Sequence, residues 1–194
     1  MAVTAAPFNL PQMDTPAGEP FGLEVSAPIK GALQEKWNGV RKALPREASI
    51  VSHCRENAET CTPAAKRFIA VVEKAASREG WARIAEVNRT INLTIKAVDD
   101  QTQYGVRDLW ASPLMTFASG AGDCEDLAIA KYVALREIGI REQSLRLVIV
   151  RDHAANEYHA VTAIRHGEQW FILDNKRLDI REDISIAEFD PLFV

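Results

Sequence analysis

The run GDCEDLAIAKYVALREIG at residues 122–139 decides the fold class of this chain. Its apolar residues recur at helical spacing, Asp123 suits the N-cap, and Gly139 suits the left-handed C-terminal position. The expected buried stripe of this helix consists of Cys124, Leu127 or Ala128, the stem of Lys131, Leu135 and Ile138. The run therefore places a cysteine in the first turn of a helix, directly after a glycine-containing loop.

Before this run, the sequence predicts three further helices and a long loop. Pro45 is expected to end the first helix. Asn88 and Asn92 lie within the third, so we treat their match to N-glycosylation acceptors as coincidence. Residues 99–122 carry several turn-forming residues and are expected to form a loop. The three helices are predicted over residues 33–44, 62–80 and 81–95.

After this run, the pattern changes to that of strands. Helices followed by antiparallel strands predict an α+β fold, because a parallel sheet would require the two to alternate. Residues 1–30, rich in Pro, Ala and Gly, are expected to form an extended N-terminal arm, and residues 31–194 a single domain. The strands are predicted over residues 145–150, 158–165 and 169–173, with 177–180 as a candidate fourth.

The composition disfavours several classes of protein. With 47% hydrophobic and 26% charged residues, the 194-residue chain has an ordinary globular composition. The formal net charge is −4 and no basic stripe is visible, which disfavours nucleic acid as a partner. No segment approaches the roughly 20 apolar residues of a membrane span. Residues 1–20 lack the basic and apolar regions of an intact signal peptide.

The three cysteines fall into a close pair and one distant residue. Cys54 and Cys61 lie in the polar stretch SHCRENAETCTP, which indicates either a small disulfide loop or a coincidence. An oxidised pair would imply that the protein works outside the cytoplasm. Cys124 is the odd cysteine, and such a residue is a candidate reactive thiol.

A hairpin downstream brings a histidine to an acid. If His166 and Gly167 form a two-residue turn, His159 lies opposite Asp174 on one face of the sheet. A four-residue loop with another register remains an alternative. The same two-residue turn pairs Arg165 with Glu168, Ala163 with Trp170, and Val161 with Ile172.

Cys124, His159 and Asp174 form a candidate catalytic triad. Backbone N–H groups at a helix start stabilise a thiolate, a histidine completes the ion pair, and an acid orients the histidine. A lone cysteine or histidine is more often structural, but the three in this order favour catalysis. Two alternatives remain: acyl transfer to an amine by the same triad, and a non-catalytic binding module on the same fold.

Asp123, Glu125 and Asp126 surround the candidate nucleophile. An N-cap with acids that complement the helix dipole accounts for them on spacing alone. Negative charges beside a thiol nevertheless oppose thiolate formation, and a bound hard cation would offset that repulsion. Oxygen ligands at such a corner suit Ca²⁺ better than Zn²⁺, although the sequence has no EF-hand signature.

Several segments together resemble the bacterial transglutaminase-like cysteine proteinase family. They are GDCEDLAIAKYVALREIGI, the preceding DLWASPLMTFASGA, the upstream VNRTIN, and the later YHAVTAI and WFILDN. The resemblance runs from about Trp37 to the C-terminus. It implies a papain-like or transglutaminase-like core, in which the nucleophile-bearing helix packs on a C-terminal antiparallel sheet.

The resemblance also implies roles for individual residues. Cys124 matches the nucleophile, His159 the general base and Asp174 the orienting acid. The matching metal ligands are Asp123 and Glu125, with Asp126 as a weaker candidate, and the metal is Ca²⁺. Trp110 is expected near the active-site cleft.

In the LapG-type branch of this family, periplasmic proteases cleave large surface adhesins near the adhesin N-terminus. The resemblance therefore implies a periplasmic protein whose signal peptide is missing from this sequence. Its implied partners are the N-terminal region of an adhesin and an inner-membrane regulatory receptor, and its implied role is the control of biofilm attachment.

Overall fold

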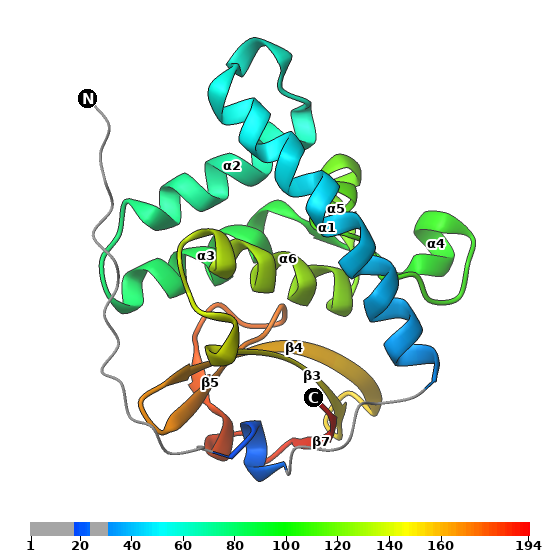
Figure 1. Cartoon of the computed structure of the whole chain (residues 1–194). Helices are drawn as coiled ribbons and strands as arrows, with labels where there is room; N and C mark the ends of the chain where they lie inside the picture. Colours follow the sequence, from blue (N-terminus) through cyan, green and yellow to red (C-terminus); the bar gives the residue numbers. More distant parts are fainter. Residues whose placement is uncertain (1–17, 24–30) are drawn as a thin grey trace.

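The structure is a computed structural model that describes residues 18–23 and 31–194. It confirms the expected α+β class: helices cover one face of a five-stranded sheet (Figure 1). Of the predicted N-terminal arm, residues 1–17 and 24–30 lie outside the described residues. No helix among the described residues is long and apolar enough to cross a membrane.

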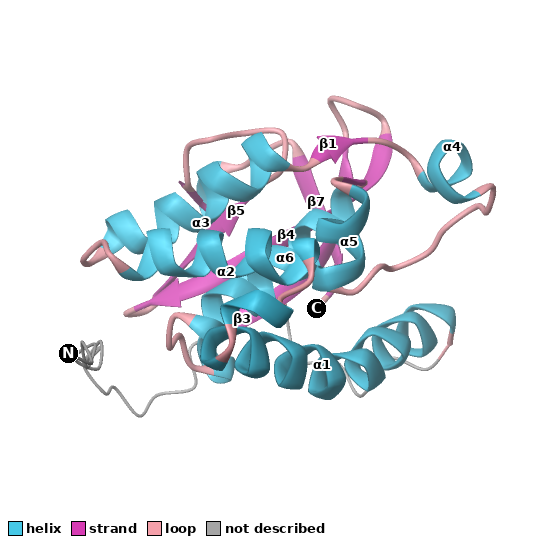
Figure 2. Cartoon of the chain, turned by 90° about the horizontal axis from the view of Figure 1, so that it is seen from above, coloured by secondary structure: helices cyan, strands magenta, loops and turns pink. Residues whose placement is uncertain are grey.

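The helical layer contains six α-helices within the described residues, all of them before the five-stranded sheet in the chain. The helices are α1 (Ala32–Glu56), α2 (Pro63–Ala76), α3 (Trp81–Thr94), α4 (Asp100–Tyr104), α5 (Pro113–Ser119) and α6 (Cys124–Glu137). The helix α6 packs against the sheet on one side and against α2, α3 and α5 on the other (Figure 1 and Figure 2).

The prediction that Pro45 ends the first helix is wrong. The helix α1 continues to Glu56 with Pro45 inside it. An interior proline removes one helical hydrogen bond, but the apolar stripe continues beyond it. Val51 and Cys54 are buried against the core, so their packing holds the second half of the helix. Cys54 and Cys61 form a disulfide with their Cα atoms 4.7 Å apart, which closes the connection between α1 and α2.

The prediction of a continuous loop over residues 99–122 is also wrong. Asp99 caps α4, since its carboxylate accepts the Thr102 N–H at 2.9 Å. Pro113 begins α5, and Phe117 of that helix is fully buried. A two-residue strand β2 (Ala121–Gly122) then pairs in parallel with β1 (Lys96–Ala97).

The main sheet is antiparallel throughout, with the strand order β6-β5-β4-β3-β7. Residues 177–180, the candidate fourth strand, form no strand, and the structure has two strands after them instead. The strands are β3 (Leu145–Asp152), β4 (Glu157–His166), β5 (Gln169–Leu173), β6 (Arg181–Glu182) and β7 (Phe189–Phe193).

The predicted register of the β4–β5 hairpin is wrong by two residues. His166 pairs with Gln169, and the turn consists of Gly167 and Glu168. Gly167 has φ +62°, so the glycine occupies the first turn position, where a positive φ is required. A two-residue shift leaves every side chain on its predicted face, because side chains alternate with a period of two. The faces expected for His159 and Asp174 are therefore retained.

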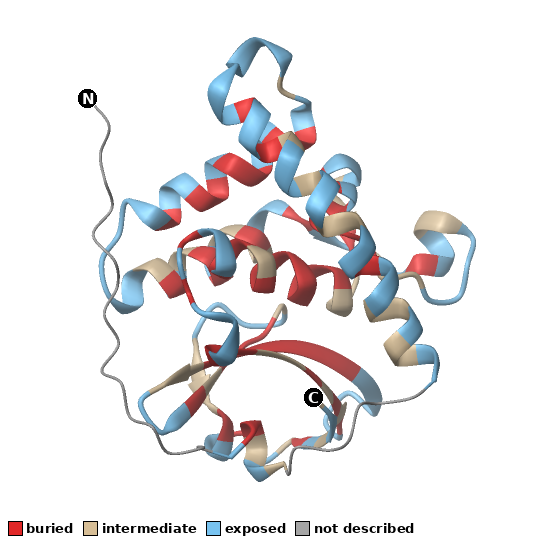
Figure 3. Cartoon of the chain, in the orientation of Figure 1, coloured by how far each residue is buried: buried red, intermediate tan, exposed pale blue. Residues whose placement is uncertain are grey.

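The helix α6 lies at the centre of the core and is buried around most of its circumference (Figure 3). Leu127 and Leu135 pack in one cluster with Phe68 of α2 and Ile91 of α3. Lys131 was expected to bury only its stem, but its whole side chain is buried.

A second cluster lies on the opposite face of the sheet, where Phe21 packs against it. The Trp170 indole N–H donates to the Gly18 carbonyl at 2.7 Å, and Arg146 forms an ion pair with the buried Glu19. Residues 18–23 thus cover part of the sheet face that the helices leave open (Figure 1).

Candidate active site

Cys124 is the first residue of α6, as the sequence predicts. The chain reaches it through β2 and through Asp123, whose extended backbone forms the N-cap. Gly122 passes closely over the first turn of α6. A Cβ atom at this position would lie 2.8 Å from the Asp126 Cβ and 2.7 Å from its Oδ2. A glycine is therefore needed to bring the cysteine to the helix start.

The Cys124 sulfur lies against β4. The Ala160 backbone N–H is directed at it, and the sulfur is 3.1 Å from Glu125 Oε2. Burial raises the pKa of the Cys124 thiol, the Glu125 and Asp123 charges raise it further, and the Ala160 N–H opposes them. With these carboxylates unneutralised, the thiol form is favoured. The Ala160 contact could not be found from the sequence, because it depends on how the helix docks on the sheet.

His159 and Asp174 form a buried pair at the part of β4 that meets this sulfur through Ala160. The residue directly before Ala160 is His159, and its Nε2 lies 2.8 Å from Asp174 Oδ1. The two residues are only 2% and 5% exposed. Asp174 follows the end of β5 and meets His159 on a diagonal, since Thr162 is the residue that pairs with Leu173. Such diagonal neighbours remain within reach of long side chains.

The hydrogen bonds of Asp174 favour its charged form. Burial by itself raises its pKa, but the hydrogen bond and charge of His159 lower it. The Lys176 N–H, which donates to Oδ1 at 2.9 Å, and the charge of Lys131 act in the same direction. The net result is a pKa below the ordinary range. Asp174 can therefore remain a carboxylate beside the imidazole.

Three carboxylates gather at the start of α6. Asp100, Asp123 and Glu125 each offer an oxygen, and these oxygens all lie within 4.8 Å of one another. The sequence reasoning missed Asp100, because only the pairing of β1 with β2 brings α4 to this corner. Asp126 has a different environment: its Oδ1 accepts the Ala111 N–H at 2.7 Å, and it is not part of this group.

The carboxylate group fits a hard cation such as Ca²⁺. Asp100 Oδ1 and Asp123 Oδ1 are buried and have no hydrogen-bond partner among the described residues. Burial raises the pKa of Asp123 to about 9, with further contributions from the charges of Glu125, Asp126 and Asp100. Burial likewise raises the pKa of Asp126 to about 7. Clustered carboxylate oxygens without donors are the ligand set that Ca²⁺ prefers.

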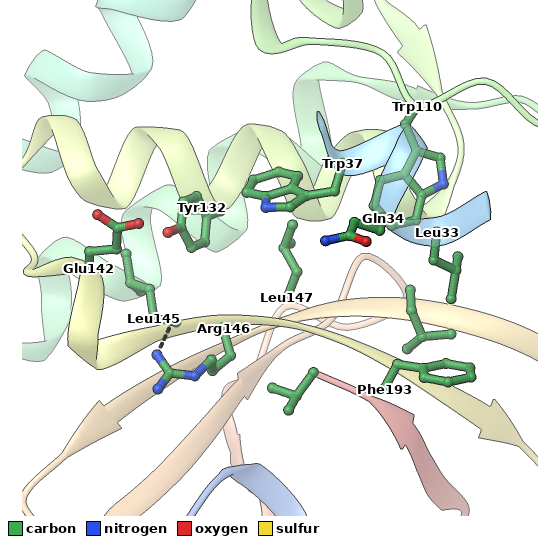
Figure 4. A pocket seen from close by; sticks show the side chains of 12 residues that line it. Leu33, Gln34, Trp37, Trp110, Tyr132, Glu142, Leu145, Arg146, Leu147 and Phe193 are labelled. Carbon is green, nitrogen blue, oxygen red and sulfur yellow. Dashed lines mark hydrogen bonds between the residues drawn. The ribbon is translucent and has the colours of Figure 1, made fainter. Parts of the chain in front are cut away.

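Trp110 lines a pocket of about 340 Å³ between the start of α1 and β3 (Figure 4). Trp37, Leu147 and Phe193 contribute other walls, so the pocket is mainly apolar. Ile149, also in the lining, pairs across the sheet with Ala160, the residue whose N–H is directed at the sulfur. The expectation that Trp110 lies near the cleft stays a prediction.

The fold and the site define a class of protein. A cysteine at the start of a central helix, packed against an antiparallel sheet that carries a buried histidine–carboxylate pair, is the arrangement of papain-like and transglutaminase-like thiol enzymes. The chain belongs to the family described as bacterial transglutaminase-like cysteine proteinase BTLCP, whose sequence profile matches residues 43–186. The resemblance predicted from the motifs is confirmed at the level of the family.

Solved structures support the same fold. Calcium-bound LapG of Legionella pneumophila superposes with a TM-score of 0.63 at 23% identity, over 73% of this chain and 81% of that chain. EGTA-treated LapG of the same organism gives 0.61 at 22% identity, over 75% and 78%. No curated protein gives a significant match.

Proposed function

We propose that this chain is an endopeptidase in which Cys124, His159 and Asp174 act as a triad. The observation that carries the proposal is the buried 2.8 Å contact between His159 Nε2 and Asp174 Oδ1. The residue after His159 is Ala160, whose N–H is directed at the cysteine sulfur. With Nε2 held by the carboxylate, Nδ1 is the ring nitrogen available for proton exchange with the thiol. Family membership supports the cysteine-protease chemistry.

The proposed reaction uses each of these residues in turn. The Cys124 proton passes to His159, and the sulfur attacks the peptide carbonyl carbon to form a C–S bond. Backbone N–H groups at the start of α6, including that of Cys124, stabilise the oxyanion. His159 then gives its proton to the leaving amine as the C–N bond breaks. It next takes a proton from water, whose oxygen attacks the thioester carbon. The C–S bond then breaks, the acid product leaves, and the proton returns from His159 to the Cys124 sulfur.

Asp100, Asp123 and Glu125 are the proposed holders of Ca²⁺, with Asp126 supporting the loop through Ala111. When bound, the cation would supply positive charge that neutralises the carboxylates beside the thiol. The buried Asp100 and Asp123 oxygens without hydrogen-bond donors among the described residues support this assignment, as does the description of a Legionella LapG structure as calcium-bound. The residues themselves position the loop from which α6 begins.

We propose the N-terminal region of a large surface adhesin as the substrate, with its release controlling biofilm attachment. The resemblance of the sequence motifs to the LapG-type branch implies a periplasmic location, and the Cys54–Cys61 disulfide suits an oxidising compartment. An inner-membrane receptor would then be the regulatory partner. Membership of a proteinase family supports a protein as the substrate.

The test is incubation of the protein with N-terminal fragments of large adhesins from the same bacterium. Wild type in CaCl₂ is expected to give two fragments, and Cys124→Ala none. Removal of Ca²⁺ by EGTA is expected to abolish cleavage, and added CaCl₂ to restore it. Cleavage by Cys124→Ala would contradict the nucleophile, and full activity in EGTA would contradict the metal. An amine adduct in place of two fragments would indicate acyl transfer.

A further inference from the structure

The segment that carries Asp174 leaves the sheet immediately after β5. Residues 174–180 form a turn and a bend, and pairing resumes only at β6. The backbone carbonyls of such a segment have no neighbouring strand, so other donors must satisfy them. The position of the Asp174 carboxylate depends on whatever holds this turn.

Two asparagines of α3 supply these donors. Asn92 Nδ2 donates to the Asp174 carbonyl at 2.8 Å and to the Arg177 carbonyl at 2.7 Å. Asn88 Nδ2 donates to the Arg177 and Leu178 carbonyls at 3.1 and 3.3 Å. The two residues are one helical turn apart and therefore lie on the same face of α3. Their amides take the place of a pairing strand along this turn.

The Asn88 side chain shows that this contact is not a surface feature. Asn88 is fully buried, and a buried N–H₂ group such as its Nδ2 generally has hydrogen-bond acceptors, which here are the two turn carbonyls. An apolar residue would satisfy helix packing at this position, but it would leave the Arg177 and Leu178 carbonyls without these donors. The burial of Asn88 and the use of the Asn92 amide in these contacts argue against either residue as a glycosylation acceptor.

The turn is held from a second direction by Lys176. Its Nζ lies 2.8 Å from Asp152 Oδ2 and 2.8 Å from Glu157 Oε1, where the β3–β4 hairpin begins and ends its turn. Its backbone N–H donates to Asp174 Oδ1. Asp174 is thus fixed between α3 and the strand that carries His159.

We propose that Asn92, with Asn88, is a positioning residue that holds the Asp174 carboxylate on His159. This proposal rests on the proposed triad. Asn92 does not touch the reacting atoms, and it acts only through the backbone of the turn. Its removal is therefore expected to matter only while the Asp174 carboxylate is present.

A double-mutant cycle tests this dependence. The readout is the rate constant for alkylation of Cys124 by iodoacetamide at one pH in CaCl₂, followed by intact mass, with the disulfide pair intact. Asn92→Asp replaces the donor by an acceptor of the same shape. Asn57→Asp makes the same change at an exposed position and is expected to leave the rate unchanged. Circular dichroism confirms that each variant is folded.

Asn92→Asp is expected to lower the rate about tenfold in the wild-type background, since small misplacements of catalytic groups cost one to two orders of magnitude. In the Asp174→Ala background its effect is expected to fall below about twofold. The same loss in both backgrounds, or none in either, would overturn the positioning role. If Asn92→Asp does not fold, Lys176→Met loosens the same turn and is expected to show the same dependence.

The two proposals fail in different ways. If Asp174→Ala itself leaves the alkylation rate unchanged, Asp174 does not act on the cysteine, and the triad and the positioning role both fall. If Asp174→Ala lowers the rate while Asn92→Asp and Lys176→Met do not, only the positioning role is overturned.

Discussion

Lys131 lies in α6, and its side chain is fully buried in the core. Its Nζ has no hydrogen-bond partner among the described residues. Burial lowers its pKa to about 7, against the opposing effect of the Asp174 charge. The pKa in the folded protein is therefore below the value of about 10.4 for an unfolded lysine. It follows that burying Lys131 costs little free energy of unfolding above about pH 10, where the amine is neutral in both states. The cost grows as the pH falls towards 7, because only the unfolded state then binds the proton readily.

Replacing Lys131 by methionine should remove this pH dependence, because methionine has a similar shape and no charge. We expect Lys131→Met to raise the free energy of unfolding at both pH values. The increase should be roughly 3 kcal/mol larger at pH 7 than at pH 9.5. Urea unfolding at the two pH values, followed by circular dichroism, measures it. Lys66→Met on the exposed face of α2 is the matched control. Equal effects of Lys131→Met at both pH values would contradict the account of the buried charge.

Gly122 gives a second test at the scale of one residue. Gly122→Ala places a Cβ against Asp126 and should displace the start of α6, so both stability and thiol reactivity should fall. A loss of about 1–3 kcal/mol is expected, as for overpacking. Gly39→Ala is the control, since nothing lies within 4 Å of its Cβ position and alanine favours a helix. Thermal melts that rank Gly122→Ala at or above wild type would refute the tight contact.

At the scale of elements, the sequence predicts the central helix and the main hairpin well, because each depends on local spacing. The stripe of α6, its N-terminal cysteine and the faces of β4 and β5 all follow from residues 122–139 and 158–173. The hairpin register was missed because the positive φ at Gly167 places the turn one residue later than expected.

Errors elsewhere come from contacts between distant segments. The second half of α1 is held across Pro45 by packing on α2 and by the disulfide. Asp100 reaches the carboxylate group through the β1–β2 pairing, and residues 177–180 are held by the α3 asparagines. No periodicity within these segments indicates such contacts, which is why the sequence located the candidate triad more completely than the candidate metal ligands.

At the scale of the whole molecule, the sheet lies between the helical layer and the short segment at residues 18–23 (Figure 1). This segment contacts the opposite face of the sheet from α6, and none of the hydrogen bonds or ion pairs described for it involves Cys124, His159 or Asp174. We therefore expect it to contribute to stability and not to the reactivity of the thiol.

Trp170→Phe tests this assignment, because it keeps an aromatic ring and removes the donor to Gly18. We expect a loss of about 1–3 kcal/mol in unfolding free energy, from the lost hydrogen bond and the smaller buried ring, with the alkylation rate of Cys124 unchanged. Tyr158→Phe, at a residue that is 67% exposed, serves as the control for loss of a polar group. A fall in alkylation rate without loss of stability would contradict the separation.

Whether Cys124, His159 and Asp174 act as one unit is decided most directly by kcat/KM for the cleaved adhesin fragment. Wild type is compared with Cys124→Ala, His159→Ala and Asp174→Ala and with the triple variant, all in CaCl₂. We expect Cys124→Ala and His159→Ala each to lower kcat/KM nearly as much as the triple variant, by about three or more orders of magnitude. If the triple variant instead lost the product of the three single-variant losses, or if either of these two variants kept substantial activity, the three residues would not act as one unit.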